Sequence, residues 1–452
     1  MASHLLKNRL GLVAAAVALV GASCGATEAP VATESDGPVE ITDTATLPTE
    51  PIPTEPIPTE PIRNSASFRG VTADTISVGV MAVEWETLAA VGVDFGRSNS
   101  ADLWEAALTA INDRGGVHGR QLVVHSEYYL PVGSASFDES CVRLTEDKEI
   151  FVVVGLQLES MALCFTELHN TASIAVAGLA DPLIERSTAP FATLWASSAT
   201  QSANTVSLAE QAGLLDDVTI GVSGATALGD LDFYSLVDAF AEAGHEVIEG
   251  LIGDTGNDIE ATGRAQDVVF ERMRDAGVDL TVATTGVPLE IFNAQSAGYS
   301  TDRWLLTVML EPNALVEAGI DLQYLDGAYA IVNTAVGTTA QPAMADDPGV
   351  AQCLADLAAG SGRTVTTELG LAVNDITVAL YACGIADLLE AALDAAGPEL
   401  TNDSLQLGLE SIGEIDLPGY FDARLEPGNL GAARGLLLAR FDADAAVWEL
   451  VD

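Results

Sequence analysis

The chain between residues 76 and 124 alternates between short apolar runs and an amphipathic stretch. The apolar run Ile76–Met81 predicts a strand that is buried on both faces. Apolar side chains then recur three and four residues apart, which is typical of a helix with one buried face. They are Leu103, Trp104, Ala107, Leu108 and Ile111. Ser98 or Ser100 can cap this helix, because a hydroxyl accepts a backbone N–H that the first turn leaves unpaired.

Two glycines end the predicted helix. Gly115 and Gly116 can adopt the left-handed conformation that closes a helix without a Cβ clash. Leu122–Val124 begin another strand almost at once. Strand, helix and strand in this order open a parallel sheet.

The same alternation continues along most of the chain. Further strands are predicted at Ile150–Gly155, Ile174–Gly178, Thr219–Ser223, Glu246–Ile252, Leu280–Thr285, Trp304–Met309 and Tyr329–Val332. Helices are predicted at Ser160–His169, Phe233–Ala243, Gly263–Ala276, Gly349–Ala359 and Leu369–Ala396. A turn at Pro427–Asn429 precedes two paired strands, Leu436–Phe441 and Val447–Val451. The pattern predicts an α/β fold of two doubly wound parallel-sheet lobes joined by a hinge, with the first crossing near Ser198–Thr205.

Length and charge narrow the function classes. At 452 residues with 48% hydrophobic residues, the chain can form two sizeable cores. It has 66 acidic against 18 basic residues, a formal net charge of −48. This balance argues against nucleic acid and against an anionic membrane surface, because both would repel the protein. It predicts a strongly solvated acidic exterior.

The amino terminus has the pattern of an export signal. Lys7 and Arg9 precede the apolar run Leu10–Val20, and small residues lead to Cys24. We predict a signal peptide at 1–23 and an extracytoplasmic protein. Cys24 after small residues resembles a bacterial lipobox, in which the cysteine becomes the lipidated first residue and anchors the protein at the cell membrane. Gly21 stands where a lipobox usually has leucine, and plain secretion is the alternative.

Residues 24–68 are predicted to be a disordered tether. They show no helical or strand period and contain three PTEPI copies between Pro48 and Ile62. Prolines favour an extended polyproline II conformation, which at about 3.1 Å per residue would reach roughly 45 Å over the repeats.

Four further cysteines, Cys141, Cys164, Cys353 and Cys383, allow three disulfide connectivities in an exported protein. The two pairs that are local in sequence are the economical choice, because each would join neighbouring helices. A metal site is the alternative, but no C-x-x-C spacing occurs, and no histidine is predicted beside these cysteines. We therefore predict two disulfides and no metal or other cofactor.

One segment carries a resemblance to a known family. The sequence AINDRGGVHGR at residues 110–120, between the strands ISVGVM and QLVVHS, is similar to the helix end of type I periplasmic-binding-fold proteins. The most similar group is the leucine/isoleucine/valine-binding type that serves ABC transporters. The resemblance extends over about residues 70–452. It implies a first lobe of 69–200 plus 336–400 and a second lobe of 201–335 plus 401–452, and it supports the Cys141–Cys164 pair.

The resemblance also implies where a solute would bind. In such sheets ligands lie beyond the carboxyl ends of the strands, and two facing lobes close on them by a hinge. The residues it places in the cleft are Glu84, Trp85, Gln157, Ser160, Gly178, Ala180, Leu228, Thr285, Gly286 and Glu311. The chain departs from the family in three of these segments, with Ala180 where a hydroxyl is usual, Leu228 where a tyrosine is frequent, and Met309 in register with the acidic residue that meets a ligand ammonium. Glu311 lies two residues beyond and needs a loop shift to replace it.

The sequence contains none of the common catalytic motifs. No nucleophile elbow, phosphate-binding loop or H-E-x-x-H helix occurs, so we predict that the protein is not an enzyme. We expect a monomeric substrate-binding protein that delivers a small polar solute, such as an amino acid or amide, to an ABC permease and its ATPase. The alternative is a sensory ligand-binding module of the same fold. No signalling domain or membrane span follows in this sequence, which favours transport.

Overall fold

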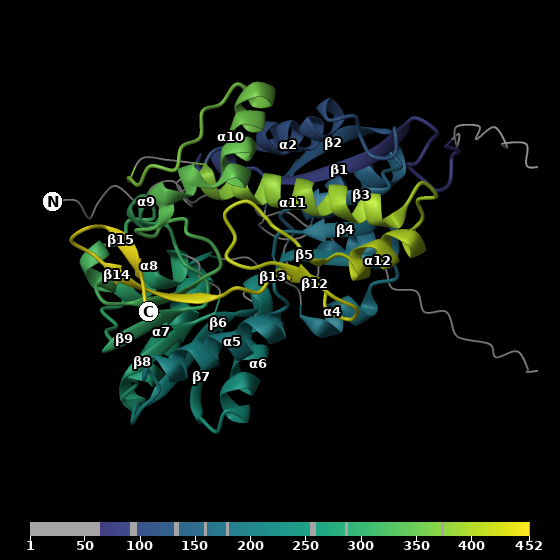
Figure 1. Cartoon of the computed structure of the whole chain (residues 1–452). Helices are drawn as coiled ribbons and strands as arrows, with labels where there is room; N and C mark the ends of the chain where they lie inside the picture. Colours follow the sequence, from purple (N-terminus) through teal and green to yellow (C-terminus); the bar gives the residue numbers. More distant parts are fainter. Residues whose placement is uncertain are drawn as a thin grey trace, which may run out of the picture. The chain divides into compact units, whose positions relative to one another are not determined.

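The structure is a computed structural model, and it describes residues 64–90, 97–130, 135–157, 161–177, 180–253, 259–284, 288–371 and 375–451. Two sheets dominate these residues (Figure 1). Each sheet with its helices forms one lobe, and the compact unit Pro61–Asp452 contains both.

The first sheet is six-stranded with the order β13-β5-β4-β3-β1-β2, and all of its strand pairs are parallel. Its strands are β1 (Thr75–Val83), β2 (Gln121–Tyr129), β3 (Val152–Gly155), β4 (Ala172–Ala175), β5 (Phe191–Trp195) and β13 (Gly431–Ala433). β1 lies between β2 and β3, as expected for a strand–helix–strand unit that starts a doubly wound sheet.

Both faces of this sheet are covered because alternate side chains of a strand point to opposite sides. Val78 and Val80 of β1 pack in the core with α2 (Ala101–Asp113), α10 (Pro348–Ser361), α11 (Ile376–Ala396) and α12 (Asn402–Ser411). Met81 and Val83 pack on the other side with α3 (Ala135–Val142), η1 (Arg143–Asp147) and η3 (Cys164–Leu168). Helix α11 is long and apolar enough to span a membrane, but 78% of its apolar window is buried, so it serves as a core helix (Figure 1).

Helix α2 begins and ends near the predicted residues. Ser100 occupies the N-cap position, but its side chain makes no capping bond, which corrects the prediction. The hydroxyl of Tyr128 accepts the backbone N–H of Ala101 instead, at 3.1 Å. At the other end Gly116 has a φ of 71°, and a Cβ there would lie 1.9 Å from the carbonyl oxygen of Arg120, so only glycine fits this turn.

The second sheet is seven-stranded with the order β15-β14-β10-β9-β8-β6-β7. Its strands are β6 (Ile220–Ala225), β7 (Val247–Ile252), β8 (Leu280–Ala283), β9 (Arg303–Leu306), β10 (Tyr329–Val332), β14 (Leu437–Asp442) and β15 (Val447–Leu450). The five strands from β6 to β10 pair in parallel, and the final hairpin β14–β15 adds to β10 in the antiparallel direction. The predicted pair of closing strands is therefore confirmed.

Helices cover both faces of this sheet as well. α5 (Ser198–Gln211) and α6 (Thr226–Glu242) pack on one face through Val206, Phe233 and Phe240. α7 (Ile259–Ala276) and α8 (Pro288–Ser296) pack on the other. The remaining short elements are α1 (Trp85–Ala90), α4 (Asp181–Arg186), α9 (Pro312–Glu317), η4 (Leu322–Leu325), η5 (Gln341–Asp346), β11 (Gly413–Glu414) and β12 (Arg424–Leu425).

The lobe boundary differs from the prediction at the carboxyl end. Residues 401–452 were assigned to the second lobe, but β13 pairs with β5 of the first sheet and α12 packs against α11. The chain crosses between the lobes three times, after β5, β10 and β13. The reason for the error is that β13 has three residues, too few to show a strand pattern in the sequence.

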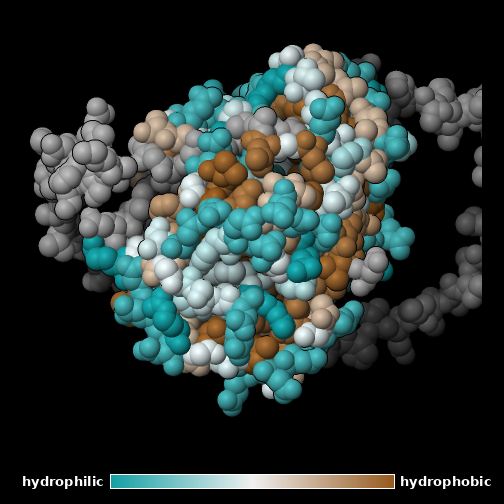
Figure 2. Space-filling model, turned by 90° about the vertical axis from the view of Figure 1, so that its left-hand side faces the viewer, coloured by the Kyte–Doolittle hydropathy of each residue, from teal (hydrophilic) through white to brown (hydrophobic). Residues whose placement is uncertain are grey.

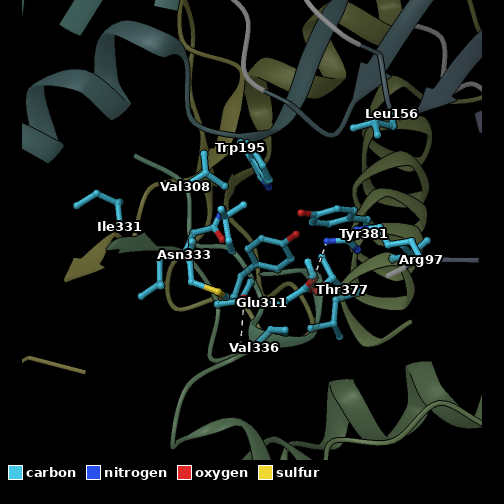
Figure 3. A pocket seen from close by; sticks show the side chains of 18 of the residues that line it. Arg97, Leu156, Trp195, Val308, Glu311, Ile331, Asn333, Val336, Thr377 and Tyr381 are labelled. Atoms are coloured by element: carbon cyan, nitrogen blue, oxygen red, sulfur yellow. Dashed lines mark hydrogen bonds and ion pairs between the residues drawn. The ribbon is translucent and has the colours of Figure 1, made fainter. Parts of the chain in front are cut away.

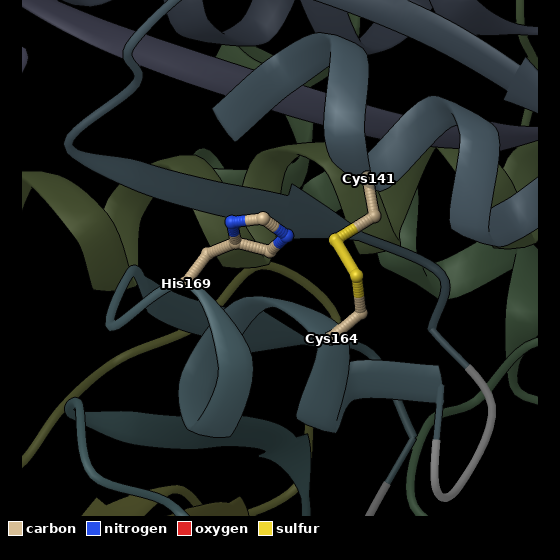
Figure 4. A group of neighbouring side chains, drawn as sticks. All are labelled: Cys141, Cys164 and His169. Carbon is tan, nitrogen blue, oxygen red and sulfur yellow. A yellow bond between two sulfur atoms is a disulfide. The ribbon is translucent and has the colours of Figure 1, made fainter. Parts of the chain in front are cut away.

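The four cysteines form the two predicted disulfides, Cys141–Cys164 and Cys353–Cys383. Cys353 and Cys383 join α10 to α11, which are neighbouring helices as predicted, and Cys141 lies near the end of α3. The ring of His169 lies beside the Cys141–Cys164 bond, with its ligand atom and both sulfurs within 4.8 Å of one another (Figure 4). The prediction that no histidine accompanies the cysteines was thus wrong, although both sulfurs are committed to each other.

On the face shown in Figure 2, hydrophilic residues run in broad bands, and hydrophobic residues lie between them. This distribution agrees with the acidic composition, in which 66 of 452 residues carry a carboxylate.

Candidate functional site

A cavity of about 260 Å³ lies between the two lobes. On the first lobe its wall is built from chain segments that follow strands: Ala82, Val83 and Trp85 at the end of β1, Leu156 after β3 and Trp195 at the end of β5. In an open parallel sheet the carboxyl ends of strands on either side of a topological switch point form a crevice. β1 and β3 are such a pair, so the sheet itself places this wall.

The second lobe contributes the residues that follow β9 and β10. Thr307–Glu311 lead from β9 to α9, and Asn333 and Thr334 lead from β10 into one of the crossings. The first two turns of α11 close the cavity with Thr377 and Tyr381. Because both lobes and the crossing segments line it, we refer to this cavity as the cleft.

An ion pair joins the lobes at one end of the cleft (Figure 3). The Arg97 guanidinium donates to the Glu311 carboxylate at 2.7 Å. Arg97 lies in the loop before α2, in the first lobe, and Glu311 is the extended N-cap residue of α9, in the second. The side chain of Glu311 is only 10% exposed, so the cleft contains a carboxylate that is largely removed from water.

The surroundings of Glu311 favour its neutral form. Burial raises the pKa of the Glu311 carboxyl, the positive Arg97 opposes this rise, and the negative Asp375 adds to it. Asp375 pairs with Arg363, whose guanidinium also bonds Asp102 at 3.0 Å. A chain of charged side chains therefore connects the cleft to the loop between α10 and α11.

Aromatic side chains form much of the remaining wall. The ring of Trp195 meets that of Tyr381 edge to face, with centroids 5.9 Å apart. Figure 3 shows the indole nitrogen of Trp195 and the hydroxyl of Tyr381 pointing into the same space. Trp85, Trp104 and Tyr420 also line the cleft. Such rings offer large apolar contact surfaces with a polar edge.

Several buried polar atoms in the cleft lack a partner among the described residues. They are the Trp195 indole nitrogen, the Tyr420 hydroxyl and the Thr377 hydroxyl. Burial raises the pKa of Tyr420 well above its ordinary value, Tyr381 adds to the rise, and the neighbouring Trp195 opposes it. The polar ends of Trp195 and Tyr420 thus lie near each other without the geometry of a hydrogen bond. An unpartnered buried polar group costs about 1–3 kcal/mol, which a ligand could recover.

The structure brings two of the predicted site residues into the cleft, Trp85 and Glu311. Glu311 precedes Pro312, which starts α9, and it has an extended conformation at φ −64° and ψ 140°. Met309, the residue in register, lines the cleft as well.

Three other predicted residues lie outside the lining of the cleft. The backbone N–H of Glu84 bonds the carbonyl of Tyr129, and Ala180 is the buried N-cap residue of α4. Gln157 is fully buried, and its side-chain oxygen accepts the hydroxyl of Ser173 at 3.0 Å.

The remaining predictions are not accessible to structural comparison. Ser160, Gly178, Thr285, Gly286 and Cys24 lie outside the described residues. Leu228 lies within α6, and its side chain is not described.

Arg97, Thr377 and Tyr381 line the cleft but were not among the residues predicted from the sequence. Arg97 is one of only 18 basic residues in the chain and lies just before the helix that carries the family resemblance. A cation at that position could have been proposed as a site residue. Thr377 and Tyr381 are spaced four apart in the first two turns of α11, which places both side chains on one face of the helix. That spacing was visible in the sequence.

Neither a protein-family model nor a curated protein sequence matches this chain. Solved structures do. A leucine-binding protein from Thermotoga maritima aligns with a TM-score of 0.60 at 11% identity, covering 84% of this chain and 98% of that one. An ABC transporter substrate-binding protein from Desulfitobacterium hafniense in complex with leucine aligns with a TM-score of 0.54 at 15% identity, over 84% and 100%.

A third similar structure has a different ligand. A solute-binding protein of an ABC transporter from R. palustris, in complex with 4-hydroxybenzoate, aligns with a TM-score of 0.59 at 16% identity, covering 84% and 96%. These likenesses show that the chain has the type I periplasmic-binding fold that the sequence predicted.

Proposed function

We propose that this protein is the extracytoplasmic substrate-binding component of an ABC importer, and that it captures a small solute in the cleft by hinge closure. The observation that carries the proposal is the cleft itself, which is lined by both lobes and by the segments that cross between them. A solute bound there contacts both lobes and stabilises the closed arrangement. Two of the structural neighbours are solute-binding or substrate-binding proteins of ABC transporters, and this supports the same role.

The lining favours a solute with an apolar body and a polar end. Trp85, Trp195 and Tyr381 supply aromatic surface, while Arg97 and Glu311 supply opposite charges at one end. A carboxylate or an ammonium of the solute could replace one partner of this pair. Amino acids with apolar side chains and aromatic acids both meet this description, and the neighbours that bind leucine and 4-hydroxybenzoate cover the same range.

We further propose that the protein is anchored through a lipid on Cys24 and carried on the tether at 24–68. This proposal depends on the export signal and on the small residues before Cys24. Incorporation of a labelled fatty acid into the wild type, and its loss in Cys24→Ala, would support the anchor. Equal labelling of both proteins would contradict it and leave the solute proposal intact.

A thermal-shift screen of amino acids, amides and aromatic acids tests the solute proposal. A ligand that binds only the folded state raises the melting temperature as its concentration increases. At one hundred times its Kd, the ligand adds about 2.7 kcal/mol to the free energy of unfolding. We expect at least one compound with an apolar body to give a saturable shift. Turnover of the bound compound, detected by mass spectrometry, would contradict a role in capture and delivery.

A further inference from the structure

A smaller cavity of about 70 Å³ adjoins the cleft on the side of the second lobe. The two cavities share four lining residues, Trp195, Gln201, Thr307 and Val308. We call the smaller one the side cavity. Figure 3 shows Trp195 and Val308 at the shared wall.

The side cavity lies at the switch point of the second sheet. Its lining includes Thr284 directly after β8 and Asp232 from α6, the helix that follows β6. β6 and β8 are adjacent in the sheet. The next strand in the chain after β6 lies on one side of this pair, and the next strand after β8 lies on the other side. The carboxyl ends at such a point are where open α/β sheets bind ligands.

Most hydroxyl groups of the side cavity have already donated their hydrogens to the protein backbone. Thr205 donates to the carbonyl of Gln201 at 2.8 Å, Thr284 to that of Ser223 at 3.0 Å, and Thr307 to that of Thr284 at 2.7 Å. Their oxygens retain lone pairs that can accept. The amide of Gln201 likewise donates to the carbonyl of Thr307 at 2.9 Å, which leaves its side-chain oxygen as an acceptor.

Asp232 adds a carboxylate to these acceptors. One of its oxygens accepts the hydroxyl of Ser198, and no basic side chain among the described residues forms an ion pair with it. Burial raises the pKa of Asp232, and the Ser198 hydroxyl opposes that rise. A partly buried carboxylate without a cation is costly, and a bound positive group would offset that cost.

We infer that the side cavity is a subsite for an ammonium group of the solute, held by Asp232 and surrounded by the acceptor oxygens of Gln201, Thr284 and Thr307. An ammonium offers three donors and no acceptor, so it can satisfy these oxygens, whereas the unpartnered Trp195 indole N–H on the shared wall needs an acceptor. This inference rests on the proposed function and deepens it. The solute would place its apolar body between the aromatic rings of the cleft and its amine in the side cavity.

The test compares probes that share a body and differ in the end group, using the protein as it is exported. The first series is phenethylamine, 2-phenylethanol and 3-phenylpropionate, and the second is isopentylamine, isopentyl alcohol and 4-methylpentanoate. Calorimetric titrations are run at high ionic strength, which screens the long-range attraction of amines to an acidic protein. In the wild type we expect each amine to bind at least about tenfold more tightly than the alcohol with the same body, a difference of about 1.4 kcal/mol.

Variants at Asp232 then locate the preference. Asp232→Asn should lower amine affinity about tenfold and leave the alcohols unchanged, whereas Asp232→Glu should retain the preference because it keeps the charge. Asp238→Asn is the matched control, since Asp238 is exposed on the same helix. It should change neither series.

The outcomes separate this inference from the proposed function. If alcohols or carboxylates bind the wild type at least as tightly as the amines do, the subsite is overturned and solute capture stands. That comparison needs no variant, so it holds even if Asp232→Asn fails to fold. An equal loss of amine affinity in Asp232→Asn and Asp238→Asn would also overturn the subsite. If no compound of either series binds, the proposal of an apolar-bodied solute falls together with this inference.

Discussion

Arg97 and Glu311 form an ion pair at 2.7 Å although 214 residues separate them in the chain. Arg97 belongs to the first lobe and Glu311 to the second, so this pair is a direct polar contact across the cleft. Its side chains are 20% and 10% exposed, so the contact is largely shielded from water.

Arg97→Gln should lower the free energy of unfolding of the ligand-free protein by about 2 kcal/mol. The substitution leaves the Glu311 carboxylate without its cation. Removing one partner of a fully buried ion pair costs roughly 3–5 kcal/mol. The expected loss is smaller here because both side chains keep some contact with water. The pKa of Glu311 should rise further. Urea denaturation measures the first effect.

The control for this change is Arg186→Gln, because Arg186 pairs with Glu167 at the exposed surface, also at 2.7 Å. We expect that substitution to change stability by less than about 0.5 kcal/mol. In addition, Glu311→Gln in the Arg97→Gln background should restore part of the lost stability. Two single substitutions whose effects simply add in the double variant would show that the pair is not coupled.

The fold was predictable because its signals are local. The buried strands β1, β6 and β10 are apolar runs of the right length, and Gly115 and Gly116 mark the end of α2 where the chain must turn. The short strand β13 could not be found in this way. Its assignment to the first sheet depends on pairing with β5, which lies more than 200 residues earlier in the chain, and no local pattern encodes that pairing.

The cleft was predictable only in part. Trp85 follows β1 directly, so topology places it at the carboxyl edge of the sheet. Arg97 and Glu311 meet only after both lobes have folded, and Tyr420 reaches the cleft from the segment between β11 and β12. Their roles depend on tertiary contacts between segments that are distant in the chain. Thr377 and Tyr381 share one face of α11, but Asp387, Glu390 and Asp394 interrupt the same apolar helix, so their spacing alone does not indicate a cleft.

Tyr420→Phe should leave the ligand-free protein as stable as the wild type or slightly more stable. The Tyr420 hydroxyl is buried without a partner among the described residues, so its removal ends a desolvation cost. Tyr299→Phe is the matched comparison, because the Tyr299 hydroxyl bonds that of Thr281 at 2.7 Å in the core. We expect that variant to lose about 1–2 kcal/mol. Calorimetric melting distinguishes the two, and equal losses would show that the Tyr420 hydroxyl has a partner.

Asp387→Asn should stabilise the protein in a pH-dependent manner. Burial raises the pKa of Asp387 from 3.8 to about 6, against the opposing charge of Arg114. A carboxyl whose folded pKa is raised contributes stability below its unfolded pKa and loses that contribution as the pH rises through the folded pKa. The variant should therefore match the wild type below pH 3.8 and gain by up to about 3 kcal/mol as the pH rises to about 6. Comparing the two proteins at each pH cancels the titration of the other carboxylates. A difference that is constant from pH 3.5 to pH 7 would contradict this account.

Trp85→Ala should weaken the binding of any compound that the thermal-shift screen identifies by at least about tenfold. Trp85 is partly exposed at the start of α1, lines the cleft and packs against the buried cluster around Met81. Loss of a large aromatic contact removes about 1.5–3 kcal/mol of apolar burial from the complex. The ligand-free melting temperature should change little by comparison. A large fall in the ligand-free melt would instead identify Trp85 as a core residue.

Replacement of both Cys353 and Cys383 by alanine should lower the free energy of unfolding by about 3 kcal/mol. The disulfide closes a loop with a sequence separation of 30 residues and so restricts the unfolded chain. It also fixes α10 to α11, the helix that carries Thr377 and Tyr381 into the cleft. The double variant of Cys141 and Cys164, with a separation of 23 residues, should lose a similar amount of stability without affecting solute affinity. If reduction of the Cys353–Cys383 bond left solute affinity unchanged while the melting temperature fell, α11 would be held in place by packing alone, and the disulfide would contribute only to global stability.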